Sequence, residues 1–319
     1  RDTGSPGLKK KIILSIVLAL IAFSTIGMWG DILDARGALK GFAWWLIPII
    51  AFFGFMNDMI KFVRWDIYLR KLGIMLSIRQ SLIVFVSGLS MSATPGKVGL
   101  LVKSRMLGGL CGRSFLSSTP VIMAELYMDL LALSVISLMA IGLLSKGIWI
   151  AILLCGLPLL GLIPGVAQKM IDLLTRLPFL AGRVQELRHA LSDMFTLLGP
   201  RTLIQAFAIT LIAWTSEGMA LHLILAGLGF EMGILHATAI FGFATLMGVL
   251  SMLPGGLIVT DAGLMGLIIH AGVPSTSAAV ATILARVFTL WLAVLVGSIV
   301  LIANRSYIYP YLGEVKQDE

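Results

Sequence analysis

Six ionisable residues lie inside strongly apolar stretches of this 319-residue chain, where they could bind a ligand, carry protons or pair with one another. They are Lys97, Glu125, Asp129, Glu217, Asp261 and Arg286. A charge inside a bilayer is costly, so such residues mark a transport pathway or an ion pair by default. Because four acids face two bases, the sequence predicts protonated acids, a wet cavity or a bound cation.

Glu125 and Asp129 are four residues apart and therefore share one face of a helix. Two neighbouring acids in a low dielectric favour a shared proton, which would suit a proton or cation relay. The competing interpretation is a pair neutralised by Lys97 or Lys103 that serves packing alone. The residue types do not decide between the two.

Asp261 and Arg286 are expected to form an ion pair in the second half of the chain, with a mainly structural role. Glu217 lies too deep in its apolar stretch to reach water, so it is expected to face a cavity or to bond to broken backbone. The sequence contains no nucleophile with a nearby base, no metal triad and no nucleotide fingerprint. No catalytic residue, metal or cofactor is therefore predicted, and an enzyme is not expected.

Two turn-like sequences interrupt the apolar stretches. Their residues are Pro95, Gly96 and Lys97 in the first break, and Pro254, Gly255 and Gly256 in the second. Helix ends exposed at such breaks offer backbone N–H groups to an anion, for example a lipid phosphate. Since turns buried in lipid are expensive, a purely structural role for two of them is the weaker interpretation.

The composition is that of a polytopic membrane protein. Hydrophobic residues make up 58% of the chain, charged residues 13%, and the mean hydropathy is +1.00; charged residues reach about a quarter in soluble domains. The formal net charge of +8 comes from basic residues between apolar stretches. That distribution indicates membrane orientation, and nucleic-acid binding is excluded on this basis.

The hydropathy pattern predicts an all-α fold with six spanning helices of about 20 residues each. They cover residues 10–29, 42–63, 115–144, 147–165, 202–229 and 276–303. Residues 79–108 and 235–271 are each broken at their Pro-Gly step. At 1.5 Å per residue the legs of the first broken segment reach only about 22 and about 18 Å, short of a 30 Å hydrocarbon core. Both segments are therefore predicted to be re-entrant hairpins, although the first leg of the second could almost cross.

The basic residues distinguish hairpins from one kinked spanning helix in the first broken segment. If both broken segments are hairpins, most of the 24 Lys and Arg residues fall on one side of the membrane. Only Arg36, Lys40 and Lys146 fall on the other, while Lys97 and Arg286 stay within the membrane. This bias predicts that both termini are cytoplasmic.

An inverted repeat follows from the odd number of crossings in each half. Residues 1–144 form the first repeat with a cytoplasmic-side hairpin at 79–108, and residues 145–319 the second with an outer-side hairpin at 235–271. The hairpin tips are expected to meet near the midplane. Residues 166–200 join the halves and are predicted to form an amphipathic interfacial helix with its apolar face in the headgroups.

These motifs resemble a known family. Thr94-Pro-Gly-Lys-Val-Gly99 with Lys103, the acids Glu125 and Asp129, and Leu253-Pro-Gly-Gly-Leu257 with Asp261, Gly272 and Arg286 are similar to the lysylphosphatidylglycerol synthase transmembrane region family. This is the flippase-like domain of multiple peptide resistance factors and of stand-alone bacterial and archaeal proteins. The resemblance implies translocation of lipids; the aminoacyl-transfer activity is not expected here.

The expected function is a lipid flippase or scramblase in a bacterial or archaeal cytoplasmic membrane. Its partners would be membrane lipids, either phospholipids or isoprenoid-linked lipids, whose headgroups cross between the hairpin tips; a homo-oligomer is left open. Lys97 would contact phosphate, while Glu125, Asp129 and Glu217 would contact cations or carry protons. The alternatives are a proton-coupled transporter of a small polar solute, and an accessory subunit of a lipid-linked sugar or hopanoid pathway.

Overall fold

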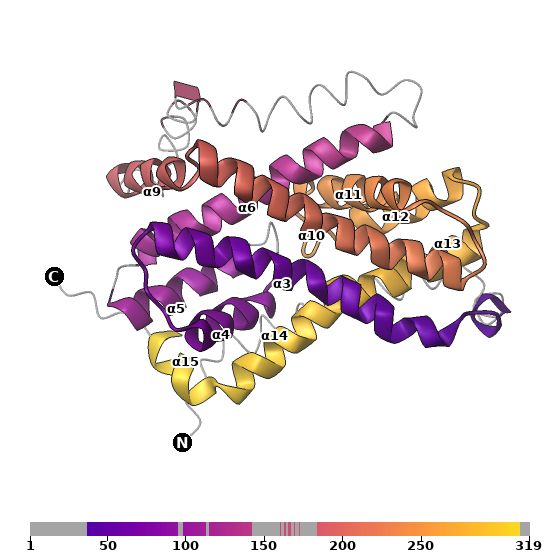
Figure 1. Cartoon of the computed structure of the whole chain (residues 1–319), viewed down its shortest axis with the longest axis horizontal. Helices are drawn as coiled ribbons and strands as arrows, with labels where there is room; N and C mark the ends of the chain where they lie inside the picture. The colour runs from indigo at the N-terminus through magenta and orange to yellow at the C-terminus, as the bar shows by residue number, and fades with distance from the viewer. Residues whose placement is uncertain are drawn as a thin grey trace.

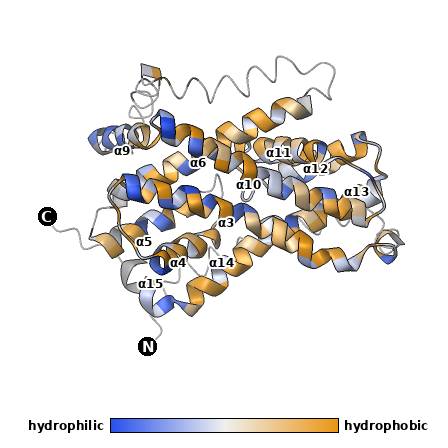
Figure 2. Ribbon diagram, viewed as in Figure 1, coloured by the Kyte–Doolittle hydropathy of each residue, from blue (hydrophilic) through white to orange (hydrophobic). Residues whose placement is uncertain are grey.

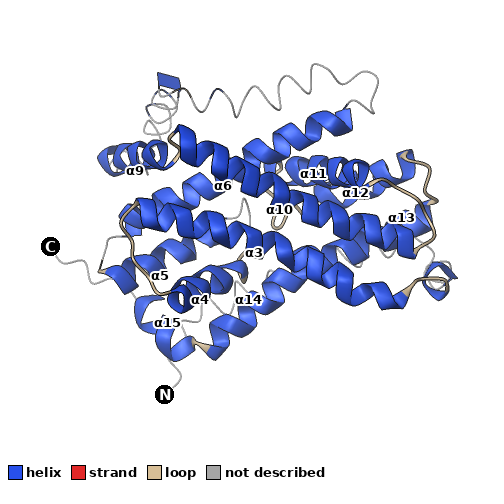
Figure 3. Cartoon of the chain, viewed as in Figure 1, coloured by secondary structure: helices blue, strands red, loops and turns tan. Residues whose placement is uncertain are grey.

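Every regular element of the described chain is a helix (Figure 3). The structure, a computed structural model, describes residues 37–94, 98–112, 115–141 and 184–312, together with positions 160, 163, 165–166, 169 and 172. These residues form eleven α-helices, two 3₁₀ turns and one π-helical segment. The prediction of an all-α fold is confirmed.

Four helical segments are long and apolar enough to cross a membrane: Trp44–Lys71, Ser118–Met139, Pro200–Gly227 and Ser275–Ala303. They contain α3 (Ile47–Lys71), α6 (Phe115–Ile141), α10 (Pro200–Gly227), and α13 (Ser275–Arg286) continued by a π-helical segment (Val287–Trp291) into α14 (Leu292–Ala303). Apolar residues extend along their lengths in Figure 2. This chain is a multi-pass membrane protein. The spans predicted at 10–29 and 147–165 lie outside the described residues, apart from three positions in the second.

The first of these segments extends further than its predicted end at residue 63. The helix continues to Lys71, and the side chains of Lys61 and Arg64 beyond and near the predicted end are buried in the protein. A buried opposite charge offsets the free energy of removing such side chains from water, which would otherwise keep them at the surface.

Shorter helices flank each break. The first break lies between α4 (Ile78–Leu89) and α5 (Val102–Cys111), and the second between α11 (Ile234–Leu250) and α12 (Val259–His270). The order long, short, short, long thus occurs twice. Figure 1 shows the α4–α5 pair and the α11–α12 pair toward opposite ends of the molecule, with α3 and α10 running between them.

Glycines permit the closest helix contacts. A Cβ atom at Gly54 of α3 would collide with the Phe288 carbonyl in the π-helical segment, and one at Gly297 of α14 would collide with the Ser90 backbone nitrogen at the end of α4. The α13–α14 span therefore touches both α3 and the first broken segment through backbone. Such approaches exclude any side chain.

Two further helices cover the end of the bundle that carries α4 and α5. They are α9 (Val184–Leu197) and α15 (Arg305–Leu312). The apolar face of α9, with Leu191, Met194 and Leu197, is buried against α6 and the surrounding core. This apolar face packs on other helices of the protein, whereas the sequence analysis expected it to lie in the lipid headgroups.

Replacing Gly54 by alanine should destabilise the protein, because its Cβ would push the Phe288 carbonyl away from α3. Overpacking of this kind costs about 1–3 kcal/mol. Thermal unfolding of purified protein measures the loss. Gly266→Ala in exposed α12 is the matched control, since nothing lies within 4 Å of that position, and it should be neutral or slightly stabilising. Equal melting temperatures for both variants would contradict the packing.

The inverted repeat expected from the sequence predicts opposite labelling of two exposed loops. With Cys111 and Cys155 replaced by serine, Met75→Cys before α4 should react with an impermeant thiol reagent only from the cytoplasmic side. Glu231→Cys before α11 should react only from outside. Both residues are exposed. Labelling of both from one face would contradict the inverted arrangement.

Candidate functional site

The two breaks touch each other. A Cβ atom built on Gly255 in the second break would lie 3.5 Å from the Ala93 Cα atom in the first. In the first break the Gly99 N–H donates to the Thr94 hydroxyl at 2.8 Å, which brings both ends of the turn together. Pro95, Gly96 and Lys97, predicted to form the tip, lie outside the described residues.

The second break has an unusual backbone. Met252 and Ile258 adopt positive φ angles of 55° and 71°, and Gly255 and Gly256 are also left-handed. Non-glycine residues in this region are strained and persist only where the surroundings fix them. Pro254 lies within this turn, so the predicted break is a tightly determined loop.

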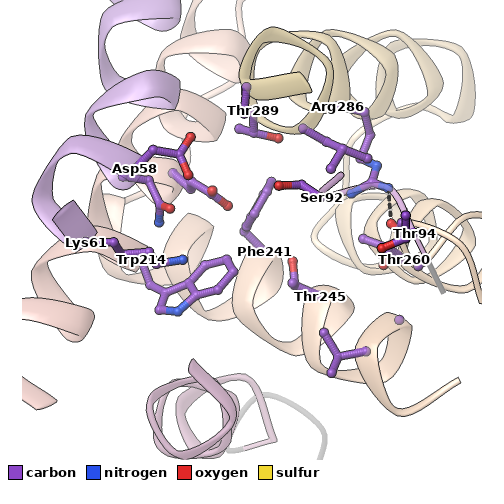
Figure 4. A pocket seen from close by; sticks show the side chains of 18 of the residues that line it. Asp58, Lys61, Ser92, Thr94, Trp214, Phe241, Thr245, Thr260, Arg286 and Thr289 are labelled. Carbon is purple, nitrogen blue, oxygen red and sulfur yellow. Dashed lines mark hydrogen bonds between the residues drawn. The ribbon is translucent and has the colours of Figure 1, made fainter. Parts of the chain in front are cut away.

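A cavity of about 90 Å³, lined by both polar and apolar groups, adjoins both breaks. Its wall includes Gly255 and Gly256 from the second break, Ser92 and Thr94 from the first, and Glu217 from α10. Further polar lining comes from α3, α11, α12, α13 and the π-helical segment. Figure 4 shows the cavity with Asp58, Lys61 and Trp214 on one side and Ser92, Thr94, Thr260 and Arg286 on the other.

Arg286 fixes the second break to α13. Its Nε atom lies 2.9 Å from the Asp261 Oδ1 atom, and its Nη2 group donates to the Gly255 carbonyl at 2.5 Å. The other Asp261 oxygen accepts the Ile258 N–H at 3.1 Å, so the carboxylate also caps α12. The predicted pairing of Asp261 with Arg286 is present. The pair holds both ends of the strained turn, with Arg286 also forming part of the cavity wall.

Asp129 binds two buried cations from α3. Its carboxylate lies 3.0 Å from the Arg64 Nη1 atom and 3.4 Å from the Lys61 Nζ atom. Arg64 also donates to the Thr210 hydroxyl of α10 at 2.6 Å. Lys61 lies 3.9 Å from the centre of the Trp214 ring and reaches the cavity wall. This cluster joins the three long helices α3, α6 and α10.

Glu125 and Lys103 form a separate buried pair, 2.7 Å apart, that joins α5 to α6. The Lys103 Nζ atom also lies 4.7 Å from the Trp65 ring centre and 4.4 Å from that of Phe85. Neither charge lines the cavity. Glu125 and Asp129 thus bind different cations, although their spacing on one helix predicted a shared site.

The sequence analysis did not count Lys61, Arg64 and Lys103 among the charges inside the bundle, whereas all three are buried beside the acids. Asp58 was also missed, and it lines the cavity one turn from Lys61. The spacing of Asp58, Lys61 and Arg64 along one helix was the available signal. Glu217 lines the cavity, which is one of the two positions that the sequence analysis expected for it.

The sequence profile of the lysylphosphatidylglycerol synthase TM region matches residues 11–297. The chain belongs to this family. The match covers both breaks, every cavity-lining residue and all three ion-pair clusters, so the resemblance based on the Pro-Gly motifs is confirmed. The described geometry is therefore that of a lysylphosphatidylglycerol synthase TM region.

Two curated relatives are both called UPF0104 membrane protein and come from Methanothermobacter thermautotrophicus. One is 31% identical over 93 residues, which is 29% of this chain and 28% of that protein. The other is 30% identical over 95 residues, 30% of this chain and 28% of that protein. The aligned part thus spans little more than a quarter of each relative.

Replacing Asp129 by asparagine should destabilise the protein strongly, because Lys61 and Arg64 would share no carboxylate. Breaking a buried ion pair costs about 3–5 kcal/mol. Lys61→Met should cost less, since Arg64 keeps Asp129. Thermal unfolding in detergent measures both, and Asp66→Asn at the more exposed pair with Arg70 is the control. A melting temperature of the Asp129 variant equal to that of the control would refute the network.

Proposed function

We propose that this chain is a lipid flippase or scramblase that moves a polar-headgroup lipid across the cytoplasmic membrane of a bacterium or archaeon. The observation that carries the proposal is the small charged cavity at the meeting point of two broken helices, inside a bundle of long apolar spans. A headgroup needs such a polar site to cross hydrocarbon, while its tails remain in the bilayer.

The packing of the described helices supports two related halves. The helices α3, α4, α5 and α6 of the first half correspond to α10, α11, α12 and the α13–α14 span of the second. α3 packs on α10. The contact of α4 with α14 corresponds to that of α11 with α6, and the contact of α5 with α6 corresponds to that of α12 with α13. The ion pairs follow the same scheme, because Lys103 and Glu125 join α5 to α6 where Asp261 and Arg286 join α12 to α13. Two inverted halves around a central site are the usual frame for alternating access.

A re-entrant course of both broken segments fits this scheme. α4, α5, α11 and α12 have 12, 10, 17 and 12 residues. Three of them are too short to cross a core of about 30 Å. We infer that the hairpins enter from opposite faces, with both termini cytoplasmic.

A proton-coupled transporter of a small polar solute is the second candidate. Asp58 and Glu217 both line the cavity, so acids that could carry protons are within reach of a ligand. The family favours lipid over solute. We propose a transporter and not an enzyme, since the sequence offers no nucleophile with a base. The third alternative, an accessory subunit of a lipid-linked sugar or hopanoid pathway, predicts that the protein alone transports nothing.

Reconstitution into liposomes tests the function directly. Fluorescent lipids of several headgroup classes should exchange between leaflets at least about tenfold faster with the protein than in empty vesicles. Uptake of polar solutes under a pH gradient is measured in parallel. Lipid movement without solute uptake supports the proposal. Solute uptake without lipid movement would establish the second candidate, and movement of neither would reject transport by the isolated chain.

A further inference from the structure

Two buried ion pairs join the short helix after each break to the long helix that follows, and they differ in how firmly they are held. Asp261 uses both carboxylate oxygens, one on Arg286 and one on the Ile258 N–H. Arg286 in turn donates to the Gly255 carbonyl, and a guanidinium stays charged at every physiological pH. Backbone groups therefore fix the pair between α12 and α13 on both sides.

The pair of Lys103 and Glu125 between α5 and α6 has no such backbone anchor. The Lys103 ammonium donates to the Glu125 Oε2 atom at 2.7 Å, and neither side chain bonds to backbone within the described chain. Both side chains are nearly sealed from solvent, with exposures of 3% and 6%. A carboxylate in such a place stays ionised only while its cation remains beside it.

Lys103 has a second set of partners in place. Its Nζ atom lies 4.7 Å from the Trp65 ring centre and 4.4 Å from that of Phe85. Aromatic faces attract an ammonium group, most strongly where water is excluded. Phe85 belongs to α4, so it lies in the same broken segment as Lys103, which consists of α4, the first break and α5. The aromatic rings therefore stabilise the ammonium group even when Glu125 is neutral.

Tyr68 supplies a second partner for Glu125. The Tyr68 side chain is fully buried on α3, and its hydroxyl makes no hydrogen bond with any described residue. It lies near enough to interact electrostatically with Glu125, Arg64 and Asp129. A buried hydroxyl without a partner is costly, so it indicates a group that reaches it in another state of the protein. A neutral carboxyl group released by Lys103 can exchange a hydrogen bond with this hydroxyl.

The other ionisable groups near Glu125 have partners of their own. Asp129 lies one turn along α6 and binds both Arg64 and Lys61 of α3. Lys103 is therefore the cation on which an ionised Glu125 depends. The remaining described ionisable side chains of α5, α9, α10 and α11 lie on other faces of α5 and α9, toward the ends of α10 and α11, or at the cavity; they are Arg105, Arg188, His189, Asp193, Arg201, His222, His236 and Glu217.

We propose that Glu125 is a proton-binding site that releases the first broken segment from α6. While Glu125 is ionised, its pair with Lys103 holds α5 on α6. When Glu125 takes up one proton, the net charge of the pair changes from zero to +1, Lys103 withdraws with α5, and the neutral carboxyl group turns to Tyr68. Loss of that proton to water restores the pair. The second broken segment stays fixed by Asp261 and Arg286 throughout.

This site goes beyond the proposed function because it supplies an energy source. A pH difference across the membrane would bias the position of one broken segment and leave the other in place. The switch itself depends only on the two ion pairs. Only its coupling to transport rests on the proposed function.

Spin-label distances test the switch without any transported lipid. In a background whose two cysteines are replaced by serine, labels at Gly109→Cys in α5 and Val63→Cys in α3 report the first broken segment. Labels at Gly266→Cys in α12 and Ile212→Cys in α10 report the second, and all four positions are exposed. Lowering the pH should change the first distance and leave the second unchanged. A first distance that is independent of pH, or an equal change in both, would overturn the inference.

Glu125→Gln imitates the protonated carboxyl group. This variant should show the low-pH distance at every pH, because a neutral amide does not hold Lys103. Asp66→Asn, in the more exposed pair with Arg70, is the matched control and should respond to pH as the unsubstituted protein does. A Glu125 variant whose distance still follows the pH would refute the proton site.

Tyr68→Phe tests the second partner of Glu125 in a protein that keeps its ion pairs. The hydroxyl has no partner in the paired state, so the melting temperature at neutral pH should hold or rise. Because the released carboxyl group loses its partner, the midpoint of the distance change should fall by roughly one pH unit. The control is Tyr127→Phe, two residues from Glu125 on a different face of α6. An unchanged midpoint in the Tyr68 variant would contradict the role of this hydroxyl.

A pH gradient across reconstituted vesicles links the switch to transport. One proton moved per lipid supports up to about tenfold accumulation of a fluorescent lipid in one leaflet for each pH unit of gradient. The unsubstituted protein should approach this ratio, while Glu125→Gln should exchange the lipid equally in both directions. Accumulation by the Glu125 variant would overturn coupling through this site. Lipid movement in no sample would reject the proposed function, and the spin-label distances would still decide whether Glu125 is the switch.

Discussion

The pairing of buried charges is the constraint on which this bundle depends. An ion taken out of water is tolerated only where an opposite charge and hydrogen-bonding groups replace its hydration. Here Asp129 joins α3 to α6, Lys103 with Glu125 joins α5 to α6, and Arg286 with Asp261 joins α13 to α12. These contacts select one arrangement of the helices, because apolar packing alone is weakly directional inside lipid.

The same rule explains how far the sequence predicted the structure. Hydropathy located the four described spans, because length and apolarity decide them, and their ends agree within a few residues except that the first span was predicted to end at residue 63 and ends at Lys71. The burial of Lys61 and Arg64 did not follow from the sequence, since a single sequence does not show that Asp129 faces them from another helix. Asp261 and Arg286 were paired correctly because each was the evident counter-charge of the other in the second half.

The cavity was predictable only in part. The Pro-Gly breaks and Glu217 pointed to it, whereas Asp58, Thr245 and Thr260 did not stand out in apolar stretches. A hydroxyl in a helix usually bonds to the carbonyl one turn earlier, as Thr210 does with Ala206. Which hydroxyl remains without such a bond depends on the three-dimensional packing, so composition and spacing could not reveal that Thr245 lines the cavity without one.

The continuous helix from Ser275 to Ala303 has a mechanical consequence. It holds the second break through Arg286 and meets the end of α4 through the backbone contact at Gly297. The contact at Gly54 lies between these two points, against the π-helical segment. Because Arg286 and Phe288 are only two residues apart, the second break and α3 are both attached to the same turn of this helix, whereas α4 meets it nine residues further on, at Gly297. A rotation of the helix about that turn would therefore move the end of α4 much further than the second break.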